Sequence, residues 1–296
     1  MIGRTLACAA AALTCFAAFA NPPHVSGDRT VTGFVNPESV GCDEKRKVLY
    51  VGNFGAPKLD PAAKDGVGYI SRMSPDGKIL DQKFLTGTAA DPMHKPKGIW
   101  VRGDRLWVTD IDAIWIFDLN TKKGRKLPLP GVVFANDPAV MGSAVYISDN
   151  RSDQLVKVEP ADFLNAKSPK VTTLFKGAGV NPNGLWPQKD GMLYMVGFVA
   201  PDKPRPVYVY GVSGQVKPIT DPIGRLDGIY EQADGSLLAT DWDSGSLFYW
   251  SEKDGKHIVA LGFKGPADFC AMKTKNGLRV FVPDLVQSQV RILDLD

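Results

Sequence analysis

The sequence predicts an all-β fold, a six-bladed β-propeller, from three observations. One motif recurs six times: a short polar lead-in, an apolar strand, a turn with charged residues or glycine, and a second strand rich in Val, Tyr, Trp and Leu. Successive copies begin 59, 40, 46, 44 and 41 residues apart, room for four short strands. Long amphipathic helices are not indicated. Four-stranded units of this kind bury their faces by packing in a closed ring.

The lead-ins of the six copies can be compared directly. They are Asn-Pro-Glu-Ser-Val at 36–40, Lys-Pro-Lys-Gly-Ile at 95–99, Ala-Asn-Asp-Pro-Ala at 135–139, Asn-Pro-Asn-Gly-Leu at 181–185, Arg-Leu-Asp-Gly-Ile at 225–229 and Pro-Ala-Asp-Phe-Cys at 266–270. A two-sheet sandwich would explain the alternation of apolar and polar residues. It would not explain six copies in the same register.

The last unit is one strand too short for a blade. It ends at Asp296, 28 residues after position 268, where its aligned residue lies. The stretch 28–34, which precedes the first motif, has the length and pattern to supply the missing strand. We therefore expect it to pair with the outer edge of the last blade and close the ring.

Residues 1–20 have the pattern of a secretory signal peptide. Arg4 gives a positive start, an apolar run too short to span a bilayer follows, and Ala18 and Ala20 suit cleavage before Asn21. The alternative is a lipid anchor at Cys15, but the residues before it fit the lipid-attachment pattern poorly. We expect a single domain over 21–296, secreted and most simply periplasmic.

The charge balance restricts the partners. The chain carries a formal charge of +3, to which Arg4 contributes one, so the mature part carries +2. No run of Lys and Arg could neutralise a phosphate backbone, so nucleic acid is not an expected partner. No second apolar stretch could span a membrane. The expected partner is a small-molecule substrate or ligand, and the expected state is a monomer.

The third residue of each aligned copy is polar. In a propeller the first strand of each blade lines the central channel, so these six side chains should surround one axis. They are Glu38, Lys97, Asp137, Asn183, Asp227 and Asp268, and Asn136 lies one residue before the third.

A divalent cation would explain this collection of oxygens. Carboxylates and amides that converge in a channel suit a hard cation, and calcium tolerates ligands from distant blades better than magnesium does. The alternative is that Lys97 neutralises two carboxylates without any metal. The asparagines favour the cation, because neutral oxygens help a metal site and do little for a salt-bridge network.

Two further patterns concern structure. Asp110, Asp149, Asp241 and Asp284 each end a second strand, which favours a role in turns. Cys42 and Cys270 lie in blades that become neighbours when the ring closes. Both are at even offsets from their aligned residues, so their side chains should point the same way unless a bulge shifts one register. A disulfide and two buried thiols both remain open.

These residues resemble the gluconolactonase and regucalcin group of calcium-dependent six-bladed propellers, with diisopropyl fluorophosphatase as a more distant relative. Glu38 falls where the group has a metal-binding glutamate. Asn183 in Asn-Pro-Asn-Gly-Leu and Asp227 in Leu-Asp-Gly-Ile match two further ligands, and Asn136 matches a direct or water-mediated ligand. The chain departs from the group at Phe134, where sugar-lactone enzymes carry an arginine that can bind oxygens in a fork.

The resemblance implies metal-assisted hydrolysis of a lactone or ester. It implies Asp227 as the catalytic base or nucleophile and Glu38, Asn183, Asp227 and Asn136 as metal ligands. Substrate would contact Asn136, Lys97 and Phe134. Two alternatives remain: a non-catalytic propeller with a structural cation that binds a small ligand or partner protein, and a strictosidine-synthase-like enzyme, which would not need the metal ring.

Overall fold

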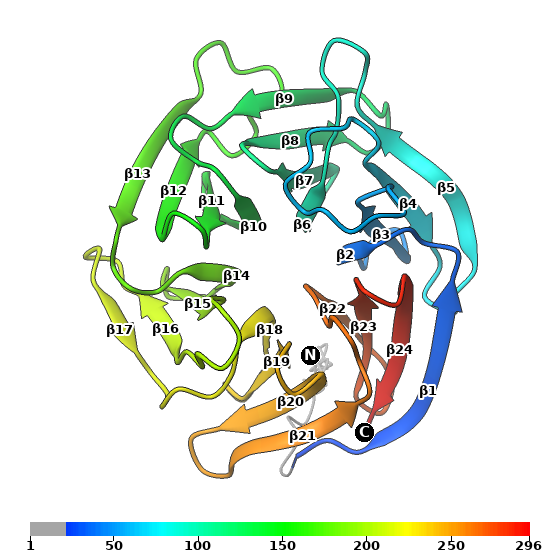
Figure 1. Cartoon of the computed structure of the whole chain (residues 1–296), viewed down its shortest axis with the longest axis vertical. Helices are drawn as coiled ribbons and strands as arrows, with labels where there is room; N and C mark the ends of the chain where they lie inside the picture. The colour runs from blue at the N-terminus through cyan, green and yellow to red at the C-terminus, as the bar shows by residue number, and fades with distance from the viewer. Residues whose placement is uncertain (1–21) are drawn as a thin grey trace, which may run out of the picture.

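The computed structural model describes residues 22–296, and all the regular structure in this part of the chain is β-strand. The predicted signal peptide, residues 1–20, lies outside the described residues. The strands form six four-stranded antiparallel sheets arranged around a central axis (Figure 1). The predicted six-bladed β-propeller is therefore confirmed. No helix in the described range is long and apolar enough to cross a membrane.

Five blades follow the chain from the inner to the outer strand. Blade 1 contains β2 (Pro37–Asp43), β3 (Val48–Asn53), β4 (Tyr69–Met73) and β5 (Ile79–Thr86). Blade 2 contains β6 (Pro96–Arg102), β7 (Arg105–Asp110), β8 (Ala113–Asp118) and β9 (Gly124–Pro128). Blade 3 contains β10 (Ala135–Met141), β11 (Ala144–Asp149), β12 (Gln154–Glu159) and β13 (Lys170–Lys176). Blade 4 contains β14 (Pro182–Pro187), β15 (Leu193–Gly197), β16 (Val207–Tyr210) and β17 (Val216–Pro218). Blade 5 contains β18 (Leu226–Glu231), β19 (Leu237–Asp241), β20 (Ser246–Ser251) and β21 (Gly255–Leu261).

The last blade combines the two ends of the domain. It contains β22 (Cys270–Lys273), β23 (Leu278–Asp284) and β24 (Gln289–Leu295), with β1 (Val25–Thr32) as its outer strand. β1 pairs antiparallel with β24, from Val25 opposite Leu295 to Thr32 opposite Gln289. The expected closing strand is thus present, three residues earlier at its start and two earlier at its end than the predicted stretch. It leaves no unpaired outer edge on the last blade.

Apolar side chains fill the spaces between neighbouring blades. One cluster joins blades 2 and 3 through Trp107, Ile116 and Val145, all nearly inaccessible to solvent. Another joins blades 6 and 1 through Phe281 and Leu49. Alternating residues of each strand face the two neighbouring blades, which accounts for the period-two pattern of the sequence. This packing holds the inner strands around the axis.

The inner strands of blades 6 and 1 are also joined directly. The N–H of Val40 donates to the carbonyl of Asp268 at 3.2 Å, and the N–H of Asp268 donates to the carbonyl of Glu38 at 3.0 Å. Cys42 and Cys270 form a disulfide across the same seam, with their Cα atoms 5.8 Å apart. Of the two readings left open, the structure has the disulfide.

The parity objection to this disulfide fails because blade 6 is shifted by one residue. The sequence alignment places Val40 of blade 1 at the same position as Cys270 of blade 6. In the structure, Val40 lies opposite Val51, two residues before the end of β3. In blade 6, Cys270 lies opposite Phe281, three residues before the end of β23. The two cysteines therefore have different offsets in the true register, and their side chains face each other.

Candidate functional site

Strand pairing identifies equivalent residues at the start of the six inner strands. In every blade, the last residue of the second strand pairs with one residue at the start of the inner strand, and we take the next residue as the one that faces the channel. The six pairs are Pro37 with Asn53, Pro96 with Asp110, Ala135 with Asp149, Pro182 with Gly197, Leu226 with Asp241 and Pro266 with Asp284. The channel ring therefore consists of Glu38, Lys97, Asn136, Asn183, Asp227 and Ala267.

This ring differs from the sequence alignment in two blades. Asn136 takes the ring position in blade 3, and Asp137 is the residue after it. In blade 6 the ring position belongs to Ala267, and Asp268 is the residue after it. All four residues with proposed metal roles, Glu38, Asn136, Asn183 and Asp227, nevertheless remain in the ring.

Asp137 and Asp268 connect neighbouring blades. The Asp137 carboxylate accepts a hydrogen bond from the backbone N–H of Leu185 in blade 4 at 2.7 Å. The Asp268 carboxylate accepts one from the hydroxyl of Ser39 in blade 1 at 2.8 Å. Both aspartates also line a cavity of about 270 Å³ in the channel. They are therefore structural links between blades, in line with their position one residue past the ring.

The aspartates that end the second strands hold the lead-ins of the inner strands. Asp110 accepts from the backbone N–H groups of His94 and Lys95, at 2.9 and 2.8 Å. Asp284 accepts from those of Lys264 and Gly265, at 2.8 and 3.1 Å. The predicted structural role is confirmed for these side chains, and they fix where each ring residue begins its strand.

The four oxygen-bearing ring residues share one unusual property. Their side chains are only 1–4 % exposed, and each has one buried oxygen without a hydrogen-bond partner among the described residues. These oxygens are Oε2 of Glu38, Oδ1 of Asn136, Oδ1 of Asn183 and Oδ1 of Asp227. A buried oxygen without a partner costs about 1–3 kcal/mol. A cation or a bound polar ligand would remove that cost.

The donor set fits calcium better than a softer metal. It offers two carboxylates and two neutral amide oxygens from four blades, all hard ligands. No group of three or more His, Cys, Asp or Glu side chains in residues 22–296 could hold a metal ion by itself. A cation at the ring therefore depends on Asn136 and Asn183 as well as on the two carboxylates.

Lys97 does not neutralise the ring by ion pairing. Within the described part of the chain it forms no ion pair, and its Nζ donates only to the carbonyl of Lys95 at a long 3.4 Å. Its ammonium lies 4.2 Å from the ring centroid of Phe134. Burial lowers the pKa of Lys97 to about 8, although the negative charge of Glu38 acts to raise it. The metal-free alternative, in which Lys97 pairs with two carboxylates, therefore has no support in the contacts.

The ring carboxyls influence one another strongly. Burial and the charge of Asp227 raise the pKa of Glu38 well above its usual value. Burial and the charge of Asp268 raise the pKa of Asp227 to about 8, although hydrogen bonds from Trp242 and Asn183 oppose this shift. Burial also raises the pKa of Asp268 to about 7. Without a cation, burial and mutual repulsion therefore favour the protonated forms of these carboxyls.

We expect the cation-free protein to lose stability as pH rises from about 4 to about 8. Asp227 and Asp268 have an ordinary pKa of 3.8, so in this range the native state binds protons that the unfolded state has released. Lys97 acts only above this range, because its pKa in the native state is about 8. Urea unfolding at pH 5 and pH 8 in chelator measures the effect. Equal free energies of unfolding at the two pH values would contradict it.

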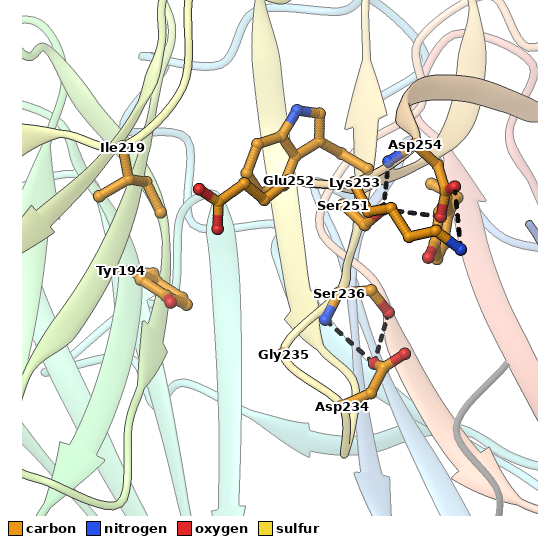
Figure 2. Close-up of a pocket in the computed structure, with 11 residues that line it drawn as sticks. Tyr194, Ile219, Asp234, Gly235, Ser236, Ser251, Glu252, Lys253 and Asp254 are labelled. Atoms are coloured by element: carbon orange, nitrogen blue, oxygen red, sulfur yellow. Dashed lines mark hydrogen bonds and ion pairs between the residues drawn. The ribbon is translucent and has the colours of Figure 1, made fainter. Parts of the chain in front are cut away.

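A second cavity, larger than the one in the channel, lies away from the ring. It has a volume of about 750 Å³ and lies between blades 4 and 5, where Tyr194 and Glu252 contribute to its walls (Figure 2). Both of its aspartates, Asp234 and Asp254, serve local turns: Asp234 accepts from the N–H and hydroxyl of Ser236 at 3.0 and 2.6 Å, and Asp254 accepts from the hydroxyl of Ser251 at 3.0 Å. No ring residue lines it, so its size alone does not make it the functional site.

Comparisons with known proteins support the fold. No protein-family model matches the chain, and no curated protein matches it in sequence. A gluconolactonase from Xanthomonas campestris has a similar structure, with a TM-score of 0.64 at 16% identity over 94% of this chain and 96% of that one. A protein provisionally described as a gluconolactonase gives a TM-score of 0.66 at 13% identity, over 93% and 94%. Virginiamycin B lyase from Staphylococcus aureus gives 0.59 at 14% identity, over 91% and 100%.

These likenesses concern the architecture. The predicted resemblance to gluconolactonase-like propellers is therefore supported at the level of the six-bladed fold. At these identities the structures do not carry over an activity, so the function has to be argued from the ring.

Proposed function

We propose that this chain is a calcium-dependent hydrolase of a lactone or ester, exported to the periplasm. The observation that carries the proposal is the set of four buried, unpartnered oxygens on Glu38, Asn136, Asn183 and Asp227. These side chains would hold the cation. When bound, it would polarise the substrate carbonyl and stabilise negative charge that develops on the carbonyl oxygen.

Asp227 would act as the general base. The indole Nε1 of Trp242 donates to Oδ2 of Asp227 at 2.9 Å, which fixes the carboxylate and leaves Oδ1 without a partner. This oxygen would take a proton from the attacking water. The water oxygen forms the new bond to the carbonyl carbon, the bond to the alcohol oxygen breaks, and the alcohol oxygen takes the proton.

Two neighbouring residues have supporting roles. Lys97 would donate to the oxygen that gains negative charge, because its ammonium has only one long hydrogen bond of its own. Asn136 would orient the substrate or the water. Its backbone is fixed, since the hydroxyl of Thr109 in blade 2 donates to its carbonyl.

The ring favours hydrolysis over the chemistry of the structurally similar lyase. Replacing one histidine of virginiamycin B lyase with alanine gives a catalytically inactive protein. None of the three histidines of this chain belongs to the channel ring. The imidazole of His94 accepts from the N–H of Gly66, and the imidazoles of His257 and His24 contact Asp254 and Asp296. A histidine-dependent reaction therefore has no equivalent group in this ring.

Calcium binding tests the metal site. We expect chelator-treated mature protein to bind calcium saturably in a calorimeter, and the Glu38→Gln, Asp227→Asn double variant to lose binding by at least about 100-fold, because the site then has no negative charge. Thermal unfolding of the variant without metal controls for its fold. If calcium, magnesium, manganese and zinc all fail to bind, the non-catalytic propeller becomes the better reading.

A further inference from the structure

The residue directly after the second strand of each blade lies next to the channel ring. We call these six residues the collar; they are Phe54, Ile111, Asn150, Phe198, Trp242 and Leu285. The N–H groups of Phe54, Phe198 and Trp242 donate at 3.0–3.1 Å to carbonyls two residues before the corresponding ring residues. The collar is therefore at the end of the channel where the inner strands begin. Five of its six members are apolar.

Two collar aromatics adjoin the proposed base. Phe198 and Trp242 are half-buried and pack edge to face, with ring centroids 5.5 Å apart and an interplanar angle of 88°. Trp242 is the residue that donates to Asp227. An aromatic ring of a substrate held beside this pair would therefore lie close to the reacting carbonyl.

Arg151, which follows the collar residue Asn150 in blade 3, carries a positive charge that is not part of an ion pair within the described residues. The guanidinium of Arg151 stacks 3.7 Å from the ring centroid of Phe134. Arg151 is exposed and forms no ion pair with any residue in the range 22–296, whereas Arg225, over the Phe198 ring, is paired with Asp243 at 2.7 Å. Arg151 is therefore an exposed cation beside the collar that is available to a ligand.

Outside the ring residues, few side chains at this end of the channel can form hydrogen bonds to a ligand. In the collar, the indole N–H of Trp242 already donates to Asp227, and Asn150, the other member with a polar side-chain group, has an Oδ1 that is buried without a partner. A sugar lactone would bring several hydroxyls to mainly apolar side chains, and each buried hydroxyl without a partner loses affinity. An aromatic ring would instead gain from leaving water.

We infer that the substrate is a lactone or ester that carries an aromatic ring and a carboxylate. The ring would pack on Phe198 and Trp242, and the carboxylate would pair with Arg151 in a forked geometry. This inference rests on the proposed function of the same site. It adds Arg151 and Phe198 to Phe134 as residues that determine specificity.

Binding tests the ligand class without turnover. With calcium-loaded protein in a calorimeter, we expect 3-phenylpropanoate to bind at least about tenfold more tightly than gluconate. Arg151→Gln should weaken this binding about tenfold or more, because a charge-assisted pair is lost. The matched control is Arg102→Gln: Arg102 is also exposed and lies over an aromatic ring, that of Trp107, but at the other end of an inner strand. An equal loss in both variants, or tighter binding of gluconate, would overturn the inference.

Kinetics separate this inference from the proposed function. We expect kcat/KM for 4-acetoxybenzoate to exceed that for glucono-1,5-lactone, and Arg151→Gln to reduce only the former. A preference for the gluconolactone would overturn the inference and leave the hydrolase proposal standing. Arg151-dependent binding of 3-phenylpropanoate with no hydrolysis of either compound would support the ligand class and overturn the hydrolase proposal. If neither binding nor hydrolysis occurs, both are wrong.

Discussion

Asp227→Asn is expected to lower kcat for lactone or ester hydrolysis about 10²–10⁴-fold at saturating calcium. Asparagine keeps the size of the side chain and an oxygen that can accept from Trp242, but it cannot take a proton from water. In the variant, the amide at position 227 could offer the cation only a neutral oxygen in place of the unpartnered carboxylate oxygen. The loss should therefore persist after calcium is raised enough to refill the site.

The matched control is Asp268→Asn. Asp268 is a buried carboxyl whose charge acts on Asp227, but it accepts from Ser39 and lies one residue past the ring position. Asparagine can still accept that hydrogen bond, so we expect kcat to change less than about tenfold. Initial rates at several calcium concentrations measure both variants. If Asp227→Asn stayed within tenfold of the unchanged protein, Asp227 would not be the base.

The fold could be predicted from the sequence because every blade repeats the same local pattern. Alternation of apolar residues defines the strands, the spacing of the copies defines the blade, and the short last unit requires a strand from elsewhere. The N-terminal strand was found in this way, with its ends displaced by two or three residues. Such ends depend on pairing with a distant strand, which local pattern does not contain.

The ring was only partly predictable because a bulge at each inner strand hides the register. In blades 3 and 6 the aspartate was aligned with the ring, whereas strand pairing places Asn136 and Ala267 there. A signal was present in the sequence: a proline precedes the ring residue in blades 1, 2, 4 and 6. Aligning Pro266 with Pro37 would have identified Ala267, and with it the different offsets of the two cysteines.

The collar could not be predicted, because apolar side chains alone do not mark a position beside the ring. The place of Phe54, Asn150 and Trp242 there follows only from the ends of the second strands. The contact between Arg151 and Phe134 likewise joins a loop to the lead-in of its own blade. Sequence spacing does not determine which way an exposed arginine points.

Replacing both cysteines is expected to give the largest loss of stability. The disulfide joins residues 228 positions apart, so in the unfolded state it closes a loop of most of the domain. Loss of a bond that closes so long a loop costs about 2–5 kcal/mol. For a domain of this size each kcal/mol corresponds to roughly 2–4 °C in Tm. We therefore expect Cys42→Ser, Cys270→Ser protein to unfold at a clearly lower temperature.

A reducing agent provides the control. It should lower the Tm of the unchanged protein to that of the double variant and leave the variant unaffected, as followed by scanning calorimetry. Equal Tm values for the oxidised protein and the variant would show that β1 and the hydrogen bonds at the seam close the ring without help. The expected loss also bears on the site, because Glu38 lies on the strand that the disulfide holds, next to the backbone bond with Asp268. Opening the seam should therefore weaken calcium binding before the domain unfolds as a whole.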